Sequence, residues 1–140
     1  MMIMLSISLP GTMPSDAYYD CRYAVLREPL GFQRGAEILS DDEQAIHAWI
    51  ELDDTVVSVG RAHLIPSGTD GSGADHKGPG AAKIPGFGPL RDDKNRPAIQ
   101  LRQMGTMDIY RRLGLAAQVF GALEANAKQH LSAKLGLLQA

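Results

Sequence analysis

The chain has 140 residues, a formal net charge of −2 at neutral pH and a single cysteine, Cys21. That length suits one domain with a proper buried core, and the charge gives no reason to expect a nucleic-acid or anionic-membrane partner. One cysteine excludes an intrachain disulfide and fits a cytoplasmic location. No apolar run is long enough to span a bilayer, and the short apolar start lacks the features of a signal peptide.

The first third of the chain predicts a strand followed by a helix. Apolar residues alternate over 3–9, which is typical of a strand, and Pro10-Gly11 closes it. Ser15-Asp16 offers an N-cap for a helix over 17–28, which Pro29 ends. The segment 32–42 is interpreted as either a loop or a second short helix.

Two alternating segments, 45–52 and 55–65, predict an antiparallel hairpin around the turn Asp53-Asp54. In the second strand, the residues predicted to share one face are Val57, Val59, Arg61 and His63. The following segment, 66–97, holds seven of the fifteen glycines and five of the eight prolines and has no apolar periodicity. It is predicted to be a flexible insertion within the domain.

The segment 99–127 predicts a strand, a turn and a helix. In the strand, 99–107, one face is predicted to carry Ile99, Leu101, Gln103 and Met107, and the other Gln100, Arg102, Met104 and Thr106. After a turn at 108–113, apolar residues recur at helical spacing from Gly114. A final apolar run, 135–139, completes a βαβ unit in which the two strands run parallel. The turn brings unpaired amides, a helix N-terminus and two arginines together, which favours a phosphate site.

The turn also resembles a known motif. Residues 111–116, Arg-Arg-Leu-Gly-Leu-Ala, resemble the Q/R-x-x-G-x-G/A motif of the GNAT superfamily of N-acetyltransferases. The strand before it is similar to the family's fourth strand, and residues 22–27 resemble its first helix. The resemblance implies an α/β fold, a GNAT-like mixed sheet with a strand–helix start, antiparallel strands and a βαβ unit that binds acetyl-CoA. One departure is Arg112, which stands where many members have glycine.

In that family, the loop amides hold the pyrophosphate of acetyl-CoA, and the backbone of the fourth strand pairs with the pantetheine arm in a wedge between the fourth and fifth strands. The cofactor-binding residues implied for this chain are Met104, Thr106, Arg111, Arg112, Leu113, Gly114, Leu115 and Ala116. The implied function is transfer of the acetyl group to a primary amine of an unknown small-molecule or peptide acceptor. The alternative is a catalytically inactive acetyl-CoA-binding fragment or interaction module.

The catalytic residues stay unassigned. In the family, a tyrosine on a fourth helix is often the acid. That helix and a closing hairpin are not found in residues 1–140, so we expect an incomplete domain that lacks the family's C-terminal third. The segment 135–139 would then be an apolar edge strand through which two copies could pair.

Several polar side chains are weighed as a base or a metal ligand. Glu51, His47 and His63 could act as a base, although an ordinary place in a strand is the favoured interpretation. Gln100 and Gln103 stand where some relatives carry a carboxylate, so no base is assigned on that strand. Tyr110 is interpreted as packing and Cys21 as a core residue, and the four histidines lack metal-ligand spacing.

Overall fold

A computed structural model of the chain describes residues 2–65, 94, 97–131 and, as backbone, 135–138. The predicted insertion, 66–97, lies outside the described residues apart from Lys94 and Pro97. In chain order the elements are β1 (Ile3–Ser8), α1 (Asp16–Leu26), η1 (Glu28–Leu30), η2 (Asp42–Gln44), β2 (Ile46–Leu52), β3 (Thr55–Ile65), β4 (Ala98–Thr106), η5 (Asp108–Tyr110), α3 (Leu115–His130) and β5 (Leu135–Leu138).

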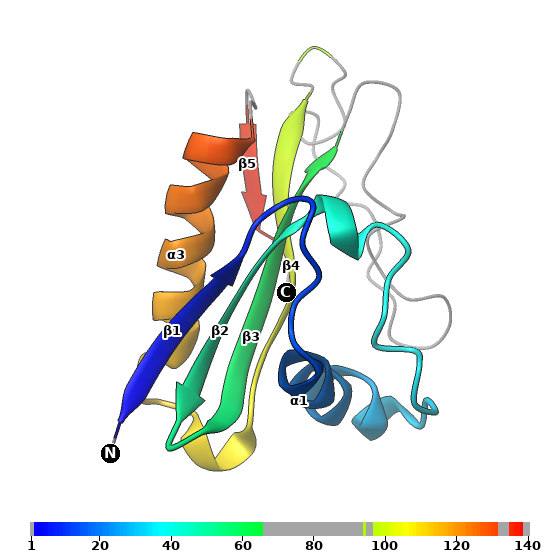
Figure 1. Cartoon of the computed structure of the whole chain (residues 1–140), viewed down its shortest axis with the longest axis vertical. Coiled ribbons are helices and arrows are strands. Elements are labelled where there is room, and N and C mark those ends of the chain that lie inside the picture. The colour runs from blue at the N-terminus through cyan, green and yellow to red at the C-terminus, as the bar shows by residue number, and fades with distance from the viewer. Residues whose placement is uncertain (1, 66–93, 95–96, 132–134, 139–140) are drawn as a thin grey trace.

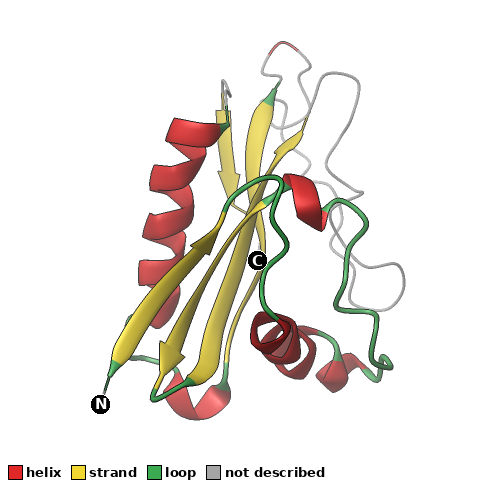
Figure 2. Ribbon diagram, in the orientation of Figure 1, coloured by secondary structure: helices red, strands yellow, loops and turns green. Residues whose placement is uncertain are grey.

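The strands form one sheet in the order β1-β2-β3-β4-β5, covered by α3 on one face and by α1 on the other (Figures 1 and 2). The first four strands are antiparallel, and β4 and β5 are parallel. The mixed sheet and the parallel βαβ unit predicted from the sequence are therefore confirmed. The strand β5 lies at the end of the sheet order, and pairing of two copies through it stays a prediction.

The β2–β3 hairpin forms as predicted, with a correction on one face. Asp53 and Asp54 both have positive φ, +48° and +71°, the backbone of a tight hairpin turn that matches the strand twist. A bulge follows, because Ile50 pairs with Ser58 while Glu51 pairs with Val56. The extra residue, Val57, packs against the α3-side core, whereas Val59 packs on the α1 side. Placing Val57 on the same face as Val59 was therefore wrong, since a bulge breaks strict alternation.

Helix α3 buries the apolar stripe that its sequence predicts. Its core residues are Leu115, Val119, Leu123 and Ala127. They pack on a sheet face formed by residues of β2, β3 and β4. The helix approaches β3 closely at Gly60, where an added Cβ would lie 2.7 Å from Val119 Cγ1.

Helix α1 begins at the predicted cap and ends at Leu26, before the predicted end at residue 28. The Ser15 side chain accepts a hydrogen bond from the Tyr18 amide at 3.3 Å. The segment 32–42 forms a loop until the short turn η2 begins at Asp42, which settles the alternative that the sequence left open. Cys21 is 4% exposed within the α1-side core.

A second bulge interrupts β4. Val59 pairs with Gly105 and Arg61 pairs with Arg102, so one residue of β3 faces two residues of β4, Gln103 and Met104. Gln103 has a φ of +56°. The predicted alternation is therefore wrong for Gln103, Met104 and Thr106, because the extra residue shifts their faces by one position. Met107 packs against both cores. Among the described residues, no helix is long and apolar enough to cross a membrane.

Candidate functional site

A cavity of about 270 Å³ lies where β4 leads into α3. Its lining residues are Thr106, Tyr110, Arg111, Arg112, Gly114, Leu115, Ala116 and Ala117. The structure thus brings most of the residues implied by the resemblance to one place, while Met104 and Leu113 do not line the cavity. Tyr110, interpreted from the sequence as packing, does pack against the α3-side core but also contributes to the wall.

The loop between β4 and α3 is shaped by two left-handed residues. Arg112 has a φ of +66° and Gly114 a φ of +76°. The loop thus takes a glycine-type conformation at the position where this chain departs from the motif. An added Cβ at Gly114 would meet no atom within 4 Å, so the space in front of this residue is open. A larger residue at Gly114 would be strained and would project into that space.

No side chain among the described residues caps the N-terminus of α3. Its N-cap is Gly114, whose carbonyl accepts from the Gln118 amide at 3.2 Å, and the first turn has no acidic residue. The amides of Leu115, Ala116 and Ala117 come before this first helical hydrogen bond, so the helix itself offers them no acceptor. These amides and the positive end of the helix dipole make the position favourable for an anion.

Two arginines add positive charge beside these amides. The Arg111 side chain is 64% exposed, lies 2.9 Å from Asp108 through Nη2, and donates through Nε to the Thr106 carbonyl at 3.4 Å. Arg112 is exposed as well. Exposed guanidinium groups next to free amides can bind a phosphate or diphosphate by charge-assisted hydrogen bonds.

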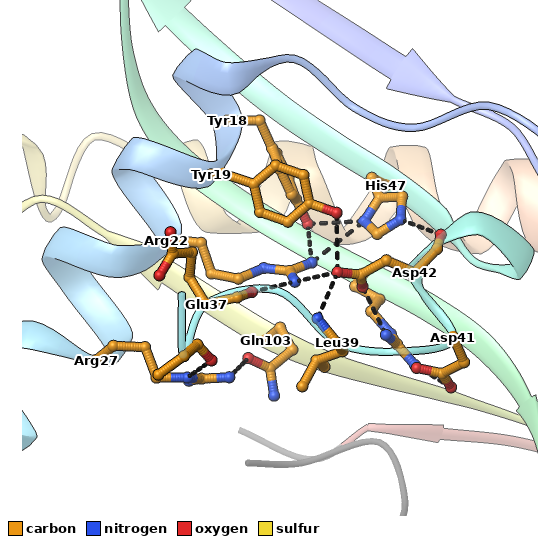
Figure 3. Close-up of polar contacts among 12 residues, drawn as sticks. Tyr18, Tyr19, Arg22, Arg27, Glu37, Leu39, Asp41, Asp42, His47 and Gln103 are labelled. Carbon is orange, nitrogen blue, oxygen red and sulfur yellow. Dashed lines mark hydrogen bonds and ion pairs between the residues drawn. The ribbon is translucent and has the colours of Figure 1, made fainter. Parts of the chain in front are cut away.

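A second polar cluster, which the sequence did not reveal, lies under α1. At its centre is Asp42, whose side chain is 0% exposed (Figure 3). Its carboxylate lies 2.9 Å from Arg22 Nη1 and 2.7 Å from Arg61 Nη1, and it accepts from the Tyr19 hydroxyl and the Leu39 amide, both at 2.9 Å. We call these five residues the α1-side cluster. The one available signal was Arg22, which stands one helical turn after Tyr18 on the face that α1 buries.

The electrostatics of the α1-side cluster follow from burial and from the paired charges. Burial on its own would raise the pKa of the Asp42 carboxyl, but Arg22, the Leu39 amide and Arg61 together hold that pKa below its usual range. Burial raises the pKa of the nearby Cys21 thiol to about 12, so this thiol stays protonated. Asp41 Oδ2 lies 2.6 Å from Arg61 Nη2 and supplies a second carboxylate, so the charges of the two buried arginines are compensated.

The two histidines weighed as bases are buried and neutral. His47 Nε2 lies 2.7 Å from the Asp42 carbonyl and must carry the proton, because a carbonyl only accepts. Its Nδ1 lies 2.8 Å from the Tyr18 hydroxyl, which completes the ring's hydrogen bonds. Burial lowers the pKa of His47 to about 4. These bonds assign His47 a structural role.

His63 also lies in the sheet, with Nε2 2.9 Å from Gln100 Oε1. Burial, followed by the charge of Arg61, lowers its pKa to about 4. Glu51 is half-buried at the end of β2. None of the three candidate bases lines the cavity. Among the described residues, no group of three or more His, Cys, Asp or Glu side chains could hold a metal ion.

Comparisons with known proteins give fold-level matches. No protein-family model matches the sequence, and no curated protein sequence matches it. Among solved structures, a ribosomal-protein-alanine N-acetyltransferase from Brucella melitensis biovar Abortus 2308 is 17% identical with a TM-score of 0.55. The match covers 99% of this chain and 80% of the N-acetyltransferase chain. The aminoglycoside N-acetyltransferase AAC(6')-Iy in complex with CoA is 9% identical with a TM-score of 0.63. This match covers 99% of this chain and 77% of the AAC(6')-Iy chain.

A GCN5-related N-acetyltransferase from Ralstonia eutropha JMP134 gives a similar result, with 10% identity, a TM-score of 0.56, and coverage of 99% of this chain and 84% of its own. At these identities, the likeness concerns the path of the backbone and not the residues of a site. It agrees with the element order and with the βαβ unit that ends the described sheet. The chain therefore has the fold of the GNAT-type N-acetyltransferases.

Proposed function

We propose that this chain is an acetyl-CoA-dependent N-acetyltransferase that acts on a primary amine of a small molecule or peptide. The observation that carries the proposal is the cavity at the uncapped N-terminus of α3. Free amides, the helix dipole and two arginines converge there, in a fold whose solved examples include N-acetyltransferases with bound CoA. A cofactor with a diphosphate satisfies all three features at once.

The residues at the cavity could bind successive parts of acetyl-CoA, from the diphosphate to the acyl-bearing arm. The amides of Leu115–Ala117 would hold the diphosphate, with Arg111 and Arg112 contributing charge. The open space at Gly114 leaves room for it to approach the backbone. Thr106 lies at the end of β4 and lines the same cavity, so the acyl-bearing arm would continue from there along β4. The last described pair of β4 with β5 is Leu101 with Leu138, whereas β4 itself continues to Thr106.

The proposed reaction is acyl transfer. The amine nitrogen attacks the thioester carbonyl, the C–N bond forms, the C–S bond breaks, and the leaving thiolate takes up a proton while the nitrogen loses one. The contribution of the cavity is to fix one reactant, since holding reactants in line is a large part of catalysis. No base is assigned, because the ring nitrogens that could accept a proton in His47 and His63 are buried away from the cavity.

The direct test is isothermal titration calorimetry with acetyl-CoA on the wild type and on Gly114→Val. The substitution places a branched side chain in the open space and forces a left-handed backbone on a residue that avoids it. We expect measurable binding by the wild type and none by Gly114→Val. The matched control is Gly121→Val, at a helical glycine of α3 where an added Cβ also meets nothing within 4 Å. It should bind like the wild type.

Undiminished affinity in a folded Gly114→Val protein would contradict the site. A thiol-release assay with a panel of amines then separates transfer from binding. Binding without thiol release would favour the second candidate, an inactive acetyl-CoA-binding module. The observation that favours this second candidate is that neither histidine weighed as a base lies in the cavity.

A further inference from the structure

The residue at the β4 bulge is held in an unfavourable backbone conformation. Gln103 has a φ of +56° within strand β4, and the residue is only 6% exposed. In this conformation the Cβ of an L residue crowds the following carbonyl, so glycine is preferred at such bulge positions. A strained residue persists only where its surroundings hold it in place. The contacts of Gln103 therefore show what maintains the bulge.

The holding contact comes from the end of α1. Arg27 donates through Nη2 to Gln103 Oε1 at 2.7 Å (Figure 3). The guanidinium is fixed in turn, because Nε donates to the Ala36 carbonyl at 2.8 Å and Nη1 to the Leu26 carbonyl at 3.1 Å. Arg27 is 1% exposed and is the C-cap of α1, where the negative end of the helix dipole favours a cation. We call this contact between Arg27 and Gln103 the clamp. It is a buried, charge-assisted hydrogen bond whose donor is itself held in place by two carbonyls.

Packing under α1 agrees with the same backbone path. Gly105 lies directly beneath the helix, and an added Cβ there would lie 2.6 Å from Val25 Cγ2 and 3.2 Å from Leu26 Cδ2. Without the extra residue at the bulge, the side chain of Met104 or Thr106 would have to point toward α1. The bulge avoids this by presenting the glycine to the helix.

The bulge decides which side chains reach the α3 side. Met104 packs against the α3-side core, and Thr106 Oγ1 lies 2.8 Å from Ser58 Oγ, directly across the β3–β4 ladder. Thr106 also lines the cavity. Strict alternation from Arg102 would turn Thr106 to the other face of the sheet. The presence of Thr106 in the cavity wall therefore depends on the conformation of Gln103.

We propose that Arg27 is a positioning residue: from the opposite face of the sheet it holds Gln103 in the left-handed conformation and so sets Thr106 and the end of β4 against the cavity. The consequence for acetyl-CoA rests on the proposed function. Arg27 does not line the cavity, and its proposed effect on the cavity passes through Gln103. Arg27 would raise the fraction of molecules in which β4 is bulged, and the affinity for acetyl-CoA would rise in proportion to that fraction.

The first experiment compares Gln103→Ala with Gln103→Gly in acetyl-CoA titrations. Both variants lose the clamp and differ by one methyl group, but only glycine takes the left-handed conformation without strain. We expect Gln103→Gly to bind within about threefold of the wild type and Gln103→Ala to bind about tenfold more weakly. When the wild type binds acetyl-CoA, equal affinities of the two variants, whether both weak or both unchanged, would overturn the proposal.

The second experiment removes the donor in two backgrounds. Arg27→Met should weaken binding about tenfold when residue 103 is glutamine and less than about twofold when it is glycine, because glycine no longer needs the clamp. A purely structural arginine would lower affinity or stability equally in both backgrounds, and that additive result would contradict a positioning role.

A structural readout keeps this inference separate from the proposed function. In NMR spectra of the ligand-free protein, the amide–α-proton coupling at residue 103 and the contacts between Thr106 and Ser58 report the bulge directly. Both should change in Arg27→Met, and the contacts between Thr106 and Ser58 should return in Arg27→Met combined with Gln103→Gly. The coupling is compared only where residue 103 is glutamine, because glycine has two α-protons. If they do so in a chain that binds no acetyl-CoA, the positioning inference stands and the proposed function fails. Unchanged signals in Arg27→Met would overturn the inference whatever the protein binds.

Discussion

The two long helices in the described part of the chain begin in opposite ways. At α1, Ser15 accepts a hydrogen bond from a first-turn amide and Asp16 places a negative charge in the first turn. At α3, the N-cap is Gly114, no side chain in the described ranges caps the helix, and the first turn has no acidic residue. Two arginines precede α3 and line a cavity with its first residues. One helix start is satisfied by the chain itself, and the other is left available.

The surroundings of the two helices differ in the same sense. Under α1, the carboxylates of Asp42 and Asp41 together match the charges of the buried Arg22 and Arg61. His47 has a hydrogen-bond partner on each ring nitrogen. A polar group that is already paired stabilises the fold but offers little to a ligand. Unpaired amides at an accessible helix start can instead donate hydrogen bonds to a ligand. The number of polar groups is therefore a poor guide to the site, and their state of satisfaction is a better one.

The largest expected effect concerns the α1-side cluster. Asp42→Asn removes the carboxylate charge between Arg22 and Arg61 and should lower the free energy of unfolding by about 3–5 kcal/mol. Urea unfolding measures it. The matched control is Asp20→Asn, which breaks the ion pair between Asp20 and Arg34. Both side chains are more than half exposed, so the loss of stability should be much smaller than in Asp42→Asn. Similar losses from both variants would mean that the cluster is not a buried unit.

A pH titration of stability sharpens the comparison, because the shifted groups lie on the α1 side. The pKa of His47 and of His63 is lowered from 6.5 to about 4 in the folded chain. The unfolded chain therefore binds more protons, and stability that is fully present above pH 6.5 is lost as the pH falls toward 4. The loss is at most about 3 kcal/mol per histidine.

The lowered pKa of Asp42 extends this loss to still lower pH. The measurement is the unfolding free energy in urea at several pH values between 7 and 4, compared with His47→Gln. This variant is less stable at pH 7 but should show a shallower pH dependence. An equally steep curve in the variant would show that His47 is not the group responsible.

A smaller effect is expected at the start of α1. Ser15→Ala removes the side-chain acceptor of the Tyr18 amide and should cost about 1 kcal/mol in unfolding free energy. Acetyl-CoA affinity should not change, since α1 starts on the other face of the sheet from the cavity. If the acetyl-CoA affinity of Ser15→Ala fell more than twofold, the start of α1 would affect binding and would not be purely structural.

Sequence patterns predicted those parts of the fold that are set by local periodicity and turn chemistry. The stripe of α3, the Ser15 cap and the Asp53-Asp54 turn each follow from a few neighbouring residues. The two β-bulges could not be predicted, because an extra residue is fixed by the partner strand and by the helices above it. As a result, Val57 and Gln103 were placed on the wrong faces.

The α1-side cluster escaped prediction for a related reason. Asp42 and Arg22 are twenty residues apart and are joined only by the fold. The cavity at α3 was foreseeable because its loop and helix start are contiguous in the sequence. Tyr110 and Ala117 were added to it only by the structure.

The most direct test of the account is an acetyl-CoA titration of Ala117→Asp beside Ala117→Asn. Residue 117 is exposed in the first turn of α3 and lines the cavity. A carboxylate there complements the helix dipole, so the protein should be more stable by about 0.3–1 kcal/mol. The same charge repels a diphosphate, so affinity should fall at least about tenfold relative to Ala117→Asn. Greater stability with weaker binding is the predicted result, and unchanged affinity in Ala117→Asp would contradict a phosphate site at this helix start.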